Sequence, residues 1–381
     1  MRQYIPFSPV EISFATRNEA LEYLYSLVSG EEKTIVMASK RRIKELDLEQ
    51  WLSDIKSTSD VIHLSHIPTN PAISDVFNNL KQLQGINPNK IIAIGGGSCI
   101  DLAKAISALY HLISEDLLSE QYVRNAIINK EYFNTKCFID IIAIPTTAGT
   151  GSEVTKWATI WDMEQKEKLS VDCTKIYPKA AVLVPEFTIS MPEKLTLSTG
   201  LDALSHAMEA FWARNRTPLS QALAITAIEY IKTYLPRVLD DGSNIEYRTG
   251  MCLASLIAGL AFSITRTTAS HSISYPLTMY YGLDHGFAAA CTLAHVADRN
   301  EAVVQDISRI YAIFGGKESF ELWIKDISLP VQELRLSAFG ISKEDIDFIA
   351  EKTFTQGRMD NNPIVFSQED VKDILYQIGS I

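Results

Sequence analysis

The sequence predicts two domains of different fold class, an α/β domain over residues 1–190 and an all-helical domain over residues 191–381. Three observations predict this division. Short aliphatic runs recur before residue 190, helical patterns dominate after it, and glycine-rich or hydroxyl-rich turns follow two of the aliphatic runs. A chain of 381 residues is long enough for two domains of ordinary size, at about 150 residues each.

The N-terminal half is predicted to contain a Rossmann-like parallel sheet. Apolar runs of about four residues are typical of strands that are buried on both faces, as in parallel sheets. Such runs occupy, in order, Thr34–Met37, Val61–Leu64, Ile91–Ile94, Ile141–Ile144 and Ala181–Val184. Helical patterns accompany them, for example at Asn18–Val28 and Asp75–Leu83. Strands that alternate with helices indicate a layered α/β domain.

The C-terminal half is predicted to be helical. Its helices are expected at Glu193–Trp212, Leu219–Tyr234, Ile245–Ile264, Ala302–Phe314 and Glu369–Ile378. The segment Met251–Ala261 is apolar on every side, which indicates a helix at the centre of a bundle. The longer apolar stretch Met251–Ile264 is too short to span a bilayer, so we expect no membrane segment.

The composition is that of a globular protein with no general affinity for nucleic acid. Apolar residues make up 46% of the chain and charged residues 21%. The net charge of −11 argues against binding to nucleic acid or to anionic membranes. The cysteines, at positions 99, 137, 173, 252 and 291, form no C-x-x-C pair, and the start of the chain lacks the pattern of a signal peptide. We therefore expect a reduced, cytoplasmic enzyme.

The segment Ile91–Lys104 runs from a predicted strand through the glycines Gly95–Gly97 into a predicted helix. Glycines let the backbone approach a pyrophosphate, and the free N–H groups at a helix start attract anionic oxygens. The G-x-G-x-x-G fingerprint is incomplete, because Ile100 stands where its last glycine would be. A structural alternative is a capping box formed by Ser98 and Asp101.

A second turn, Pro145–Thr155, follows the next predicted strand and is rich in small and hydroxyl residues. Ligands of α/β proteins bind at strand ends, so two such turns together favour a dinucleotide site. The structural alternative is again a capping box, here between Thr150 and Glu153. Cys99, beside the first turn, is interpreted as a packing residue rather than as a thiol activated by a helix start.

Three of the seven histidines and one aspartate form a candidate metal site. Asp202 and His206 are spaced i, i+4, so on a helix both can reach one ion, and His271 and His285 follow later in the chain. Three imidazoles and one carboxylate suit Fe²⁺ or Zn²⁺ with a position left open for a substrate oxygen. The alternative is a surface hydrogen bond between Asp202 and His206, with the other histidines satisfied in the core.

Together these motifs resemble the iron-containing (group III) alcohol dehydrogenase family over nearly the whole chain. The matching segments are Thr69–Pro71, Gly95–Lys104, Pro145–Thr155, Gly200–Glu209, and His271 with His285. The resemblance implies an N-terminal nucleotide domain, a C-terminal metal domain, a homodimer, and NAD(P)-dependent interconversion of alcohols and aldehydes. This architecture is shared with dehydroquinate synthase, so a lyase of that kind is an alternative function.

The resemblance also assigns roles residue by residue. The ion, expected to be Fe²⁺ with Zn²⁺ or Mn²⁺ also compatible, would be held by Asp202, His206, His271 and His285. The pyrophosphate would lie against Gly96, Gly97 and Ser98. Other cofactor contacts would come from Asn70, Asp101, Thr146, Thr147 and Lys168. The ion would polarise the aldehyde oxygen, and the nicotinamide would supply the hydride.

One departure from the family pattern concerns proton transfer. Many relatives carry a further histidine four residues after the ligand that matches His271, and this chain has Tyr275 there. The reference pKa of a tyrosine is about 10, so a proton relay through this position is not expected. Tyr275 is interpreted as a pocket residue, either as a hydrogen-bond donor or by packing beside Pro276.

A second departure concerns the choice of cofactor. NAD-using relatives often place an acidic residue just after the strand that matches Thr34–Met37, to hold the adenosine ribose. This chain has Ser39 instead, which removes repulsion against a 2′-phosphate, and Lys40 or Arg41 can pair with that phosphate. We therefore expect NADPH to be preferred over NADH. The alternative is that these residues only form a solvated helix start.

The segment Thr265–Thr278 resembles the phosphonoacetaldehyde reductases, a branch of this family that makes 2-hydroxyethylphosphonate. Arg266, among hydroxyl residues just before a metal ligand, can bind an anionic group bidentately. Weaker candidates for this role are Lys156, Arg214 and Arg216. We therefore expect a small anionic aldehyde as substrate. The alternatives are a general short-chain alcohol, diol or 4-hydroxybutyrate dehydrogenase, the lyase, and a nucleotide-binding protein without catalysis.

Overall fold

The computed structural model describes residues 8–28, 32–112, 118–354 and 357–379. The chain divides into two compact units. The α/β unit comprises Ser8–Thr147 and Ser152–Ser190, and the helical unit contains Ala148–Gly151 together with the chain from Met191 onward. Nothing in the sequence signals that the short segment Ala148–Gly151 belongs with the helical unit.

The predicted parallel sheet is confirmed in the α/β unit. Among the described residues six strands pair in the order β1-β8-β5-β4-β2-β3, and every neighbouring pair is parallel. The strands are β1 (Glu11–Phe14), β2 (Thr34–Met37), β3 (Val61–Leu64), β4 (Lys90–Gly95), β5 (Asp140–Pro145) and β8 (Ala180–Leu183). The unexpected strand β1 lies at one edge and is mostly exposed, so it lacks the aliphatic run that marks the central strands.

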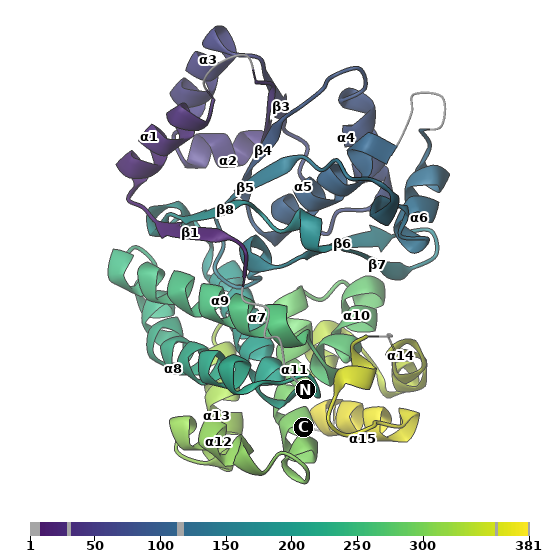
Figure 1. Cartoon of the computed structure of the whole chain (residues 1–381). Coiled ribbons are helices and arrows are strands. Elements are labelled where there is room, and N and C mark those ends of the chain that lie inside the picture. The colour runs from purple at the N-terminus through teal and green to yellow at the C-terminus, as the bar shows by residue number, and fades with distance from the viewer. Residues whose placement is uncertain (1–7, 29–31, 113–117, 355–356, 380–381) are drawn as a thin grey trace. The chain divides into compact units, whose positions relative to one another are not determined.

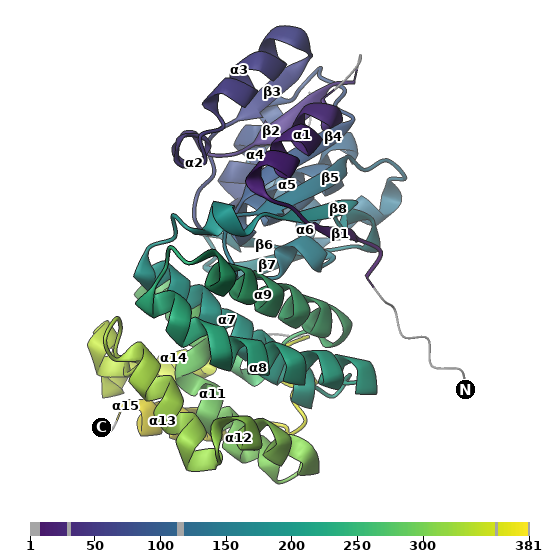
Figure 2. The same ribbon diagram turned by 90° about the vertical axis from the view of Figure 1, so that its left-hand side faces the viewer.

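Helices cover both faces of this sheet (Figures 1 and 2). One layer contains α1 (Arg17–Leu27), α2 (Lys40–Glu45) and α3 (Glu49–Thr58), and the other contains α4 (Ile73–Gln82), α5 (Gly97–Leu109) and α6 (Glu120–Ile128). Successive strand residues enter opposite cores: Ile91 packs with the second layer and Ile92 with the first. Because both faces are buried, the strands read as continuous aliphatic runs.

An antiparallel hairpin lies outside the main sheet in the same unit. It is formed by β6 (Trp157–Asp162) and β7 (Glu167–Asp172), with Trp161 opposite Lys168. The sequence does not predict this hairpin, because its strands mix polar and apolar residues. The main-chain N–H of Trp161 donates to the carbonyl of Pro71 at 2.8 Å, which attaches the hairpin to the segment before α4.

The predicted all-helical fold of the C-terminal half is also confirmed (Figure 1). Its helices are α7 (Glu193–Trp212), α8 (Pro218–Asp240), α9 (Ile245–Thr265), α10 (Ala269–Tyr281), α11 (His285–Glu301), α12 (Ser308–Phe314), α13 (Lys317–Ser328), α14 (Ile346–Lys352) and α15 (Gln368–Gly379). The helix α9 is long and apolar enough to cross a membrane, but 67% of its most apolar window is buried. It packs against α7 and α8 and is a core helix of this unit.

The predicted helix Ala302–Phe314 is wrong at its start. The helix α11 continues to Glu301, and α12 begins only at Ser308. Between them the N–H groups of Val303 and Val304 both donate to the carbonyl of Asn300, which forms a turn. Val304 and Ile307 are buried within this connection. Burial of a turn therefore produced the apolar pattern that resembled a helix.

Candidate metal centre and cofactor turns

The candidate metal ligands come from three helices of the helical unit. Asp202 lies on α7, His271 on α10 and His285 at the first position of α11. One ligand atom from each of these residues lies within 4.8 Å of the other two. The Oδ1 atom of Asp202 is 3.5 Å from Nε2 of His271 and 3.9 Å from Nε2 of His285. Three residues far apart in sequence thus meet at one point.

His206, the fourth predicted ligand, lies beside this group. Its Nδ1 atom is 3.9 Å from Oδ2 of Asp202, and its ring stacks on that of His271 with centroids 4.5 Å apart. On its other side the ring stacks on Phe262 at 4.1 Å. Stacking between two neighbours fixes the plane of the imidazole, which is what a metal ligand requires.

In each of the three histidines the Nδ1 atom faces an oxygen. That of His206 is 3.3 Å from the carbonyl of Gly149, and that of His285 is 3.5 Å from Oγ of Ser274. The Nδ1 of His271 forms a short hydrogen bond with Oε2 of Glu209. Metal-bound histidines usually donate their other ring N–H to such an oxygen, which fixes the tautomer. The arrangement therefore leaves each Nε2 lone pair available to an ion.

Two buried atoms of the group have no hydrogen-bond partner among the described residues. These atoms are Oδ1 of Asp202 and Nε2 of His271. Both are acceptors when His271 carries its proton on Nδ1, and 3.5 Å is too far for a good hydrogen bond between them. Buried polar atoms are almost always satisfied, so a bound cation is the physical explanation that fits both. The donor set of imidazoles and one carboxylate suits Fe²⁺ or Zn²⁺.

The electrostatics of the group also favour positive charge. Burial alone would raise the pKa of the Asp202 carboxyl, but His206, His271 and His285 lower it below its usual range. Burial lowers the pKa of His206 and would lower that of His271, but Glu209 and Asp202 raise the pKa of His271. Two carboxylates around one imidazole make a place where a proton or a metal ion is stabilised.

Glu209 is a candidate site residue that the sequence interpretation did not single out. It is fully buried, and its Oε1 accepts hydrogen bonds from the N–H groups of Ser270 and His271 at 2.8 and 3.3 Å and from the Thr268 hydroxyl at 2.8 Å. These N–H groups belong to the first turn of α10, so Glu209 caps that helix from α7. The signal was available, since Glu209 follows Asp202 by seven residues and shares its helix face.

Tyr275 and Arg266 lie on either side of His271 in the chain. Tyr275 is one helical turn later on α10, is buried, and its ring is parallel to that of His285 at a centroid distance of 6.1 Å. Arg266 ends α9 with φ 66° and ψ 176°. The weaker candidates are elsewhere engaged: Lys156 lies 4.0 Å from the Asp172 carboxylate, and Arg216 donates to carbonyls at the end of α7. Arg214 is exposed.

The first glycine turn and the second turn meet in the α/β unit. The N–H of Thr146 donates to the carbonyl of Gly95 at 3.0 Å. A Cβ atom on Gly96 would lie 3.1 Å from Oγ1 of Thr147, so only glycine fits this approach without displacement. The N–H of Asn70 donates to Oγ of Ser98 at 3.3 Å. The fold thus gathers Asn70, Gly96, Ser98, Thr146 and Thr147, five of the predicted cofactor residues, around one strand end.

Both capping-box alternatives are wrong. Gly96 is the N-cap of α5 and no side chain caps it, so Gly97 and Ser98 lie in the first turn of the helix. After the second turn only a short 3-10 segment, Ser152–Val154, follows rather than an α-helix. The carboxylate of Asp101 instead accepts the Ser152 hydroxyl at 2.6 Å and the Thr159 N–H at 2.9 Å. A cofactor contact would share these carboxylate oxygens.

Lys104 is a second residue that sequence interpretation missed. Its side chain is fully buried on α5, and Nζ donates to the carbonyl and hydroxyl of Ser152 at 2.6 and 3.0 Å. It also donates to the Thr155 hydroxyl and to the carbonyl of Trp157, at 2.9 and 3.0 Å. Burial lowers the pKa of Lys104 to about 8, although Asp101 and Glu153 oppose this change. Lys104 joins the helix after the first turn to the segment after the second.

The remaining predicted cofactor residues lie at the start of α2 and on β7. Ser39 is the N-cap of α2 and accepts the N–H of Arg42 at 3.1 Å, while Arg41 pairs with Glu45 at 2.5 Å. Lys40 is the exposed first residue of that helix, which fits both a solvated helix start and a contact with a 2′-phosphate. Lys168 lies on β7, and its charge is among those that lower the pKa of Asp101, which burial raises.

Cys99 packs as expected. Its side chain is buried and its thiol lies 3.3 Å from the carbonyl of Met37, to which it donates. Burial raises the pKa of this thiol to about 12. A Cβ atom on Gly95 would lie 2.5 Å from that of Cys99, so the thiol fills the space beside the turn. An activated nucleophile would need a lowered pKa.

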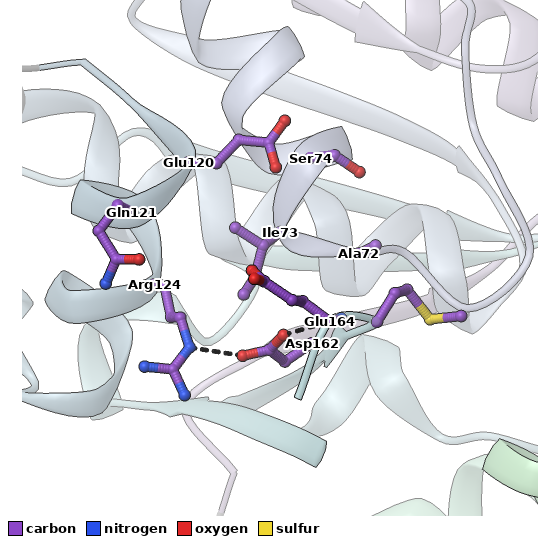
Figure 3. Close-up of a pocket in the computed structure, with 9 residues that line it drawn as sticks. Ala72, Ile73, Ser74, Glu120, Gln121, Arg124, Asp162 and Glu164 are labelled. Carbon is purple, nitrogen blue, oxygen red and sulfur yellow. Dashed lines mark hydrogen bonds and ion pairs between the residues drawn. The ribbon is translucent and has the colours of Figure 1, made fainter. Parts of the chain in front are cut away.

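The α/β unit also contains a cavity of about 200 Å³, which is lined neither by the candidate metal ligands nor by the two cofactor turns (Figure 3). Ion-paired side chains lie at its wall, where Arg124 of α6 contacts Asp162 at 2.5 Å. Its lining comprises Ala72, Ile73, Ser74, Glu120, Gln121, Arg124, Asp162, Met163 and Glu164. None of the predicted site residues lines it.

Comparison with known proteins identifies the family of this chain. Residues 11–185 match the family model described as iron-containing alcohol dehydrogenase, and residues 196–379 match the model described as the C-terminal part of the Fe-containing alcohol dehydrogenase family. The NAD-dependent methanol dehydrogenase of Bacillus methanolicus is 31% identical over 331 residues, which cover 83% of this chain and 84% of that protein.

Two further relatives have anionic aldehydes in their names. The phosphonoacetaldehyde reductase of Streptomyces viridochromogenes is 35% identical over 237 residues, covering 62% of this chain and 59% of that protein. The crystal structure of sulfoacetaldehyde reductase from Bifidobacterium kashiwanohense in complex with NAD⁺ superimposes with a TM-score of 0.84, at 28% identity and full coverage of both chains. With both halves of the chain matched, this protein belongs to the iron-containing alcohol dehydrogenase family of oxidoreductases.

Proposed function

We propose that the protein reduces a small anionic aldehyde, such as phosphonoacetaldehyde, to the corresponding alcohol with NADPH and Fe²⁺. The observation that carries the proposal is Arg266, a guanidinium that directly precedes the segment bearing the ligand His271 and has a strained backbone. Such outliers persist at functional sites, where the surrounding structure holds them. The names of the phosphonoacetaldehyde and sulfoacetaldehyde reductases support this substrate class.

In this proposal Asp202, His206, His271 and His285 hold the ion. When bound, the ion polarises the aldehyde oxygen and stabilises the negative charge that develops on it, and the nicotinamide supplies the hydride. Glu209 keeps the proton of His271 on Nδ1, so that Nε2 remains a ligand. Arg266 binds the anionic end of the substrate through paired hydrogen bonds. Tyr275 shapes the wall beside His285.

The test compares initial rates of NADPH oxidation with phosphonoacetaldehyde, propanal and succinic semialdehyde, using the Fe²⁺-loaded protein. A kcat/KM advantage of about 100-fold for the phosphonate over propanal, or about 2.7 kcal/mol, indicates an anion pocket. Arg266→Ala should remove this advantage while leaving propanal turnover unaffected. Comparable rates for all three aldehydes would favour a general short-chain alcohol dehydrogenase, which the match to the methanol dehydrogenase also supports.

The preference for NADPH rests on Ser39 and Lys40, which follow β2 and bring no carboxylate to the expected place of the adenosine ribose. Ser39 is uncharged, and Lys40 is exposed at the start of α2, where it can meet a 2′-phosphate. The measurement is kcat/KM for both cofactors at equal concentrations. A higher value for NADH, the cofactor class in the name of the methanol dehydrogenase, would contradict the preference.

We also propose a cytoplasmic homodimer in which residues 1–190 bind the dinucleotide and residues 191–381 bind the metal. The chain has a mass of 42.5 kDa, so sedimentation at about twice this mass supports the dimer. Iron is distinguished from zinc and manganese by metal analysis of protein purified without added metal. Sedimentation at the monomer mass would contradict the dimer.

A further inference from the structure

We propose that Asn361 is a positioning residue that holds Arg266 in the orientation needed to bind the anionic end of the substrate. The inference deepens the proposed function and rests on it. Asn361 lies at the end of the short 3-10 segment Met359–Asn361, far in sequence from α9 and α10. It is buried, with 6% of its surface exposed.

The need for such a residue arises from the backbone of Arg266. Its φ of 66° and ψ of 176° lie in a region that glycine occupies and that side-chain-bearing residues avoid. Lys130, by comparison, has φ 54° and ψ 42°, the ordinary left-handed conformation. An arginine does not keep the conformation of Arg266 by local preference, so contacts from elsewhere in the fold must hold it.

The amide of Asn361 supplies these contacts. Its Nδ2 donates to the carbonyl of Thr265 at 2.8 Å and to the carbonyl of Thr267 at 3.0 Å, on either side of Arg266. Carbonyl oxygens only accept hydrogen bonds, so the NH₂ group of the Asn361 amide, and not its oxygen, must face Thr265 and Thr267. The carbonyl of Arg266 accepts the Thr265 hydroxyl at 2.9 Å. All three carbonyls of the turn are therefore occupied.

The same turn is held at its other end by the metal group. Two residues after Arg266, the Thr268 hydroxyl donates to Glu209 and accepts the indole N–H of Trp212 at 2.9 Å. Asn361 is itself fixed, because its carbonyl accepts the N–H of Arg214 at 2.9 Å. The position of Arg266 relative to His271 is thus set by Asn361 on one side and by Glu209 on the other.

The test uses four proteins: the unchanged enzyme, Asn361→Ala, Arg266→Gly and the double variant. The quantity measured is the ratio of kcat/KM for phosphonoacetaldehyde to that for propanal. We expect Asn361→Ala to lower this ratio about tenfold, mainly through KM for the phosphonate, because a displaced guanidinium loses its paired hydrogen bonds. In the Arg266→Gly background the same substitution should change the ratio by less than about twofold, since no guanidinium is left to position.

Asn361→Asp keeps the shape of the side chain but presents a carboxylate oxygen to the two carbonyls, and it should lower the ratio as alanine does. It also provides a result if the alanine variant does not fold. The matched control is Asn300→Ala, because Asn300 and Asn362 pair their buried amides at 2.9 and 3.1 Å. This control disturbs the same segment but leaves the Asn361 amide in place, so Tm should fall while the ratio is unchanged.

The outcomes separate the inference from the function on which it rests. If Arg266→Gly leaves the ratio unchanged, the anion-binding role of Arg266 is wrong and the proposed function fails. If Arg266→Gly lowers the ratio but neither Asn361 variant does, only the positioning role is overturned. Equal losses of kcat/KM for both aldehydes, or a loss that persists in the glycine background, would also overturn it.

Discussion

Replacing Glu209 by glutamine tests whether this carboxylate prepares His271 for metal binding. The carboxylate accepts hydrogen bonds from the Thr268 hydroxyl, the N–H groups of Ser270 and His271, and Nδ1 of His271. A glutamine can offer its single oxygen either to the start of α10 or to the imidazole, but not to both. If its NH₂ group faces the ring, Nδ1 must become an acceptor and the ring proton moves to Nε2. That tautomer cannot bind an ion through Nε2.

The magnitude follows from the role of such partners. Loss of the group that orients a ligating histidine typically lowers metal affinity by about 10- to 100-fold. This corresponds to about 1.4–2.7 kcal/mol. If the NH₂ group faces the helix instead, the N–H groups of Ser270 and His271 lose their acceptor, at a cost of about 1–3 kcal/mol in stability. The first orientation therefore lowers metal affinity and the second lowers the free energy of unfolding.

The assay is a competition between the protein and a chelator of known affinity, followed by metal analysis of the protein fraction. Thermal unfolding with and without metal gives a second measure, because bound metal stabilises the folded state by an amount that grows with the logarithm of its affinity. Glu153→Gln is the control, since Glu153 is also a buried glutamate but belongs to the α/β unit. Equal metal affinity in Glu209→Gln and in the unchanged protein would refute the reasoning.

Three further substitutions test the strain at residue 266, the buried ammonium of Lys104 and the buried thiol of Cys99. Arg266→Gly should unfold at a higher Tm than Arg266→Ala, by about 1–3 kcal/mol in unfolding free energy, because only glycine adopts φ 66° and ψ 176° without strain. Equal stabilities would mean that this backbone is not strained. Lys104→Met should lower stability by about 3–5 kcal/mol in urea unfolding, since it leaves the buried charges of Asp101 and Glu153 without their cation. It should also weaken NADPH binding, measured by nucleotide fluorescence. Unchanged stability together with unchanged NADPH affinity would contradict the role of Lys104 in joining α5 to the segment after the second turn. Burial raises the pKa of Cys99 from 9.0 to about 12, so the folded state holds this proton more tightly than the unfolded state does. The resulting stabilisation is complete below about pH 9 and is lost as pH rises toward 12; Cys99→Ala should flatten this decline, and an identical pH profile for the variant would argue against it.

The fold was predictable where one physical cause dominates the sequence. Strands β2, β4 and β5 are buried on both faces, so their aliphatic runs mark them directly. The edge strand β1 and the β6–β7 hairpin escaped this rule because partial exposure permits polar residues. The turn between α11 and α12 caused the opposite error, in which a helix was predicted where none forms. A buried connection needs apolar side chains as much as a helix does, so its sequence resembles that of a helix.

The site was predictable to the extent that its chemistry needs particular residue types. Asp202, His206, His271 and His285 could be recognised because carboxylates and imidazoles are residue types that bind Fe²⁺ or Zn²⁺. The i, i+4 spacing of Asp202 and His206 also places both on one face of α7. Lys104 could not be recognised in the same way, since a lysine on a helix is ordinarily exposed. Its role depends on Ser152, Thr155 and Trp157, whose approach is a property of the folded unit alone.

Glu209 and Asn361 form hydrogen bonds to different parts of the same short segment, residues 265–271. Glu209 holds its later part, from Thr268 to the candidate ligand His271, and Asn361 holds its earlier part around Arg266. Because the two supports act on different residues, a change at position 266 need not disturb the metal ligand. Substrate preference would then be able to change between anionic and neutral aldehydes while the metal centre stays the same. This separation predicts that Arg266→Gly binds metal as tightly as the unchanged protein, and a weakened metal affinity in that variant would show that the two ends of the segment are coupled.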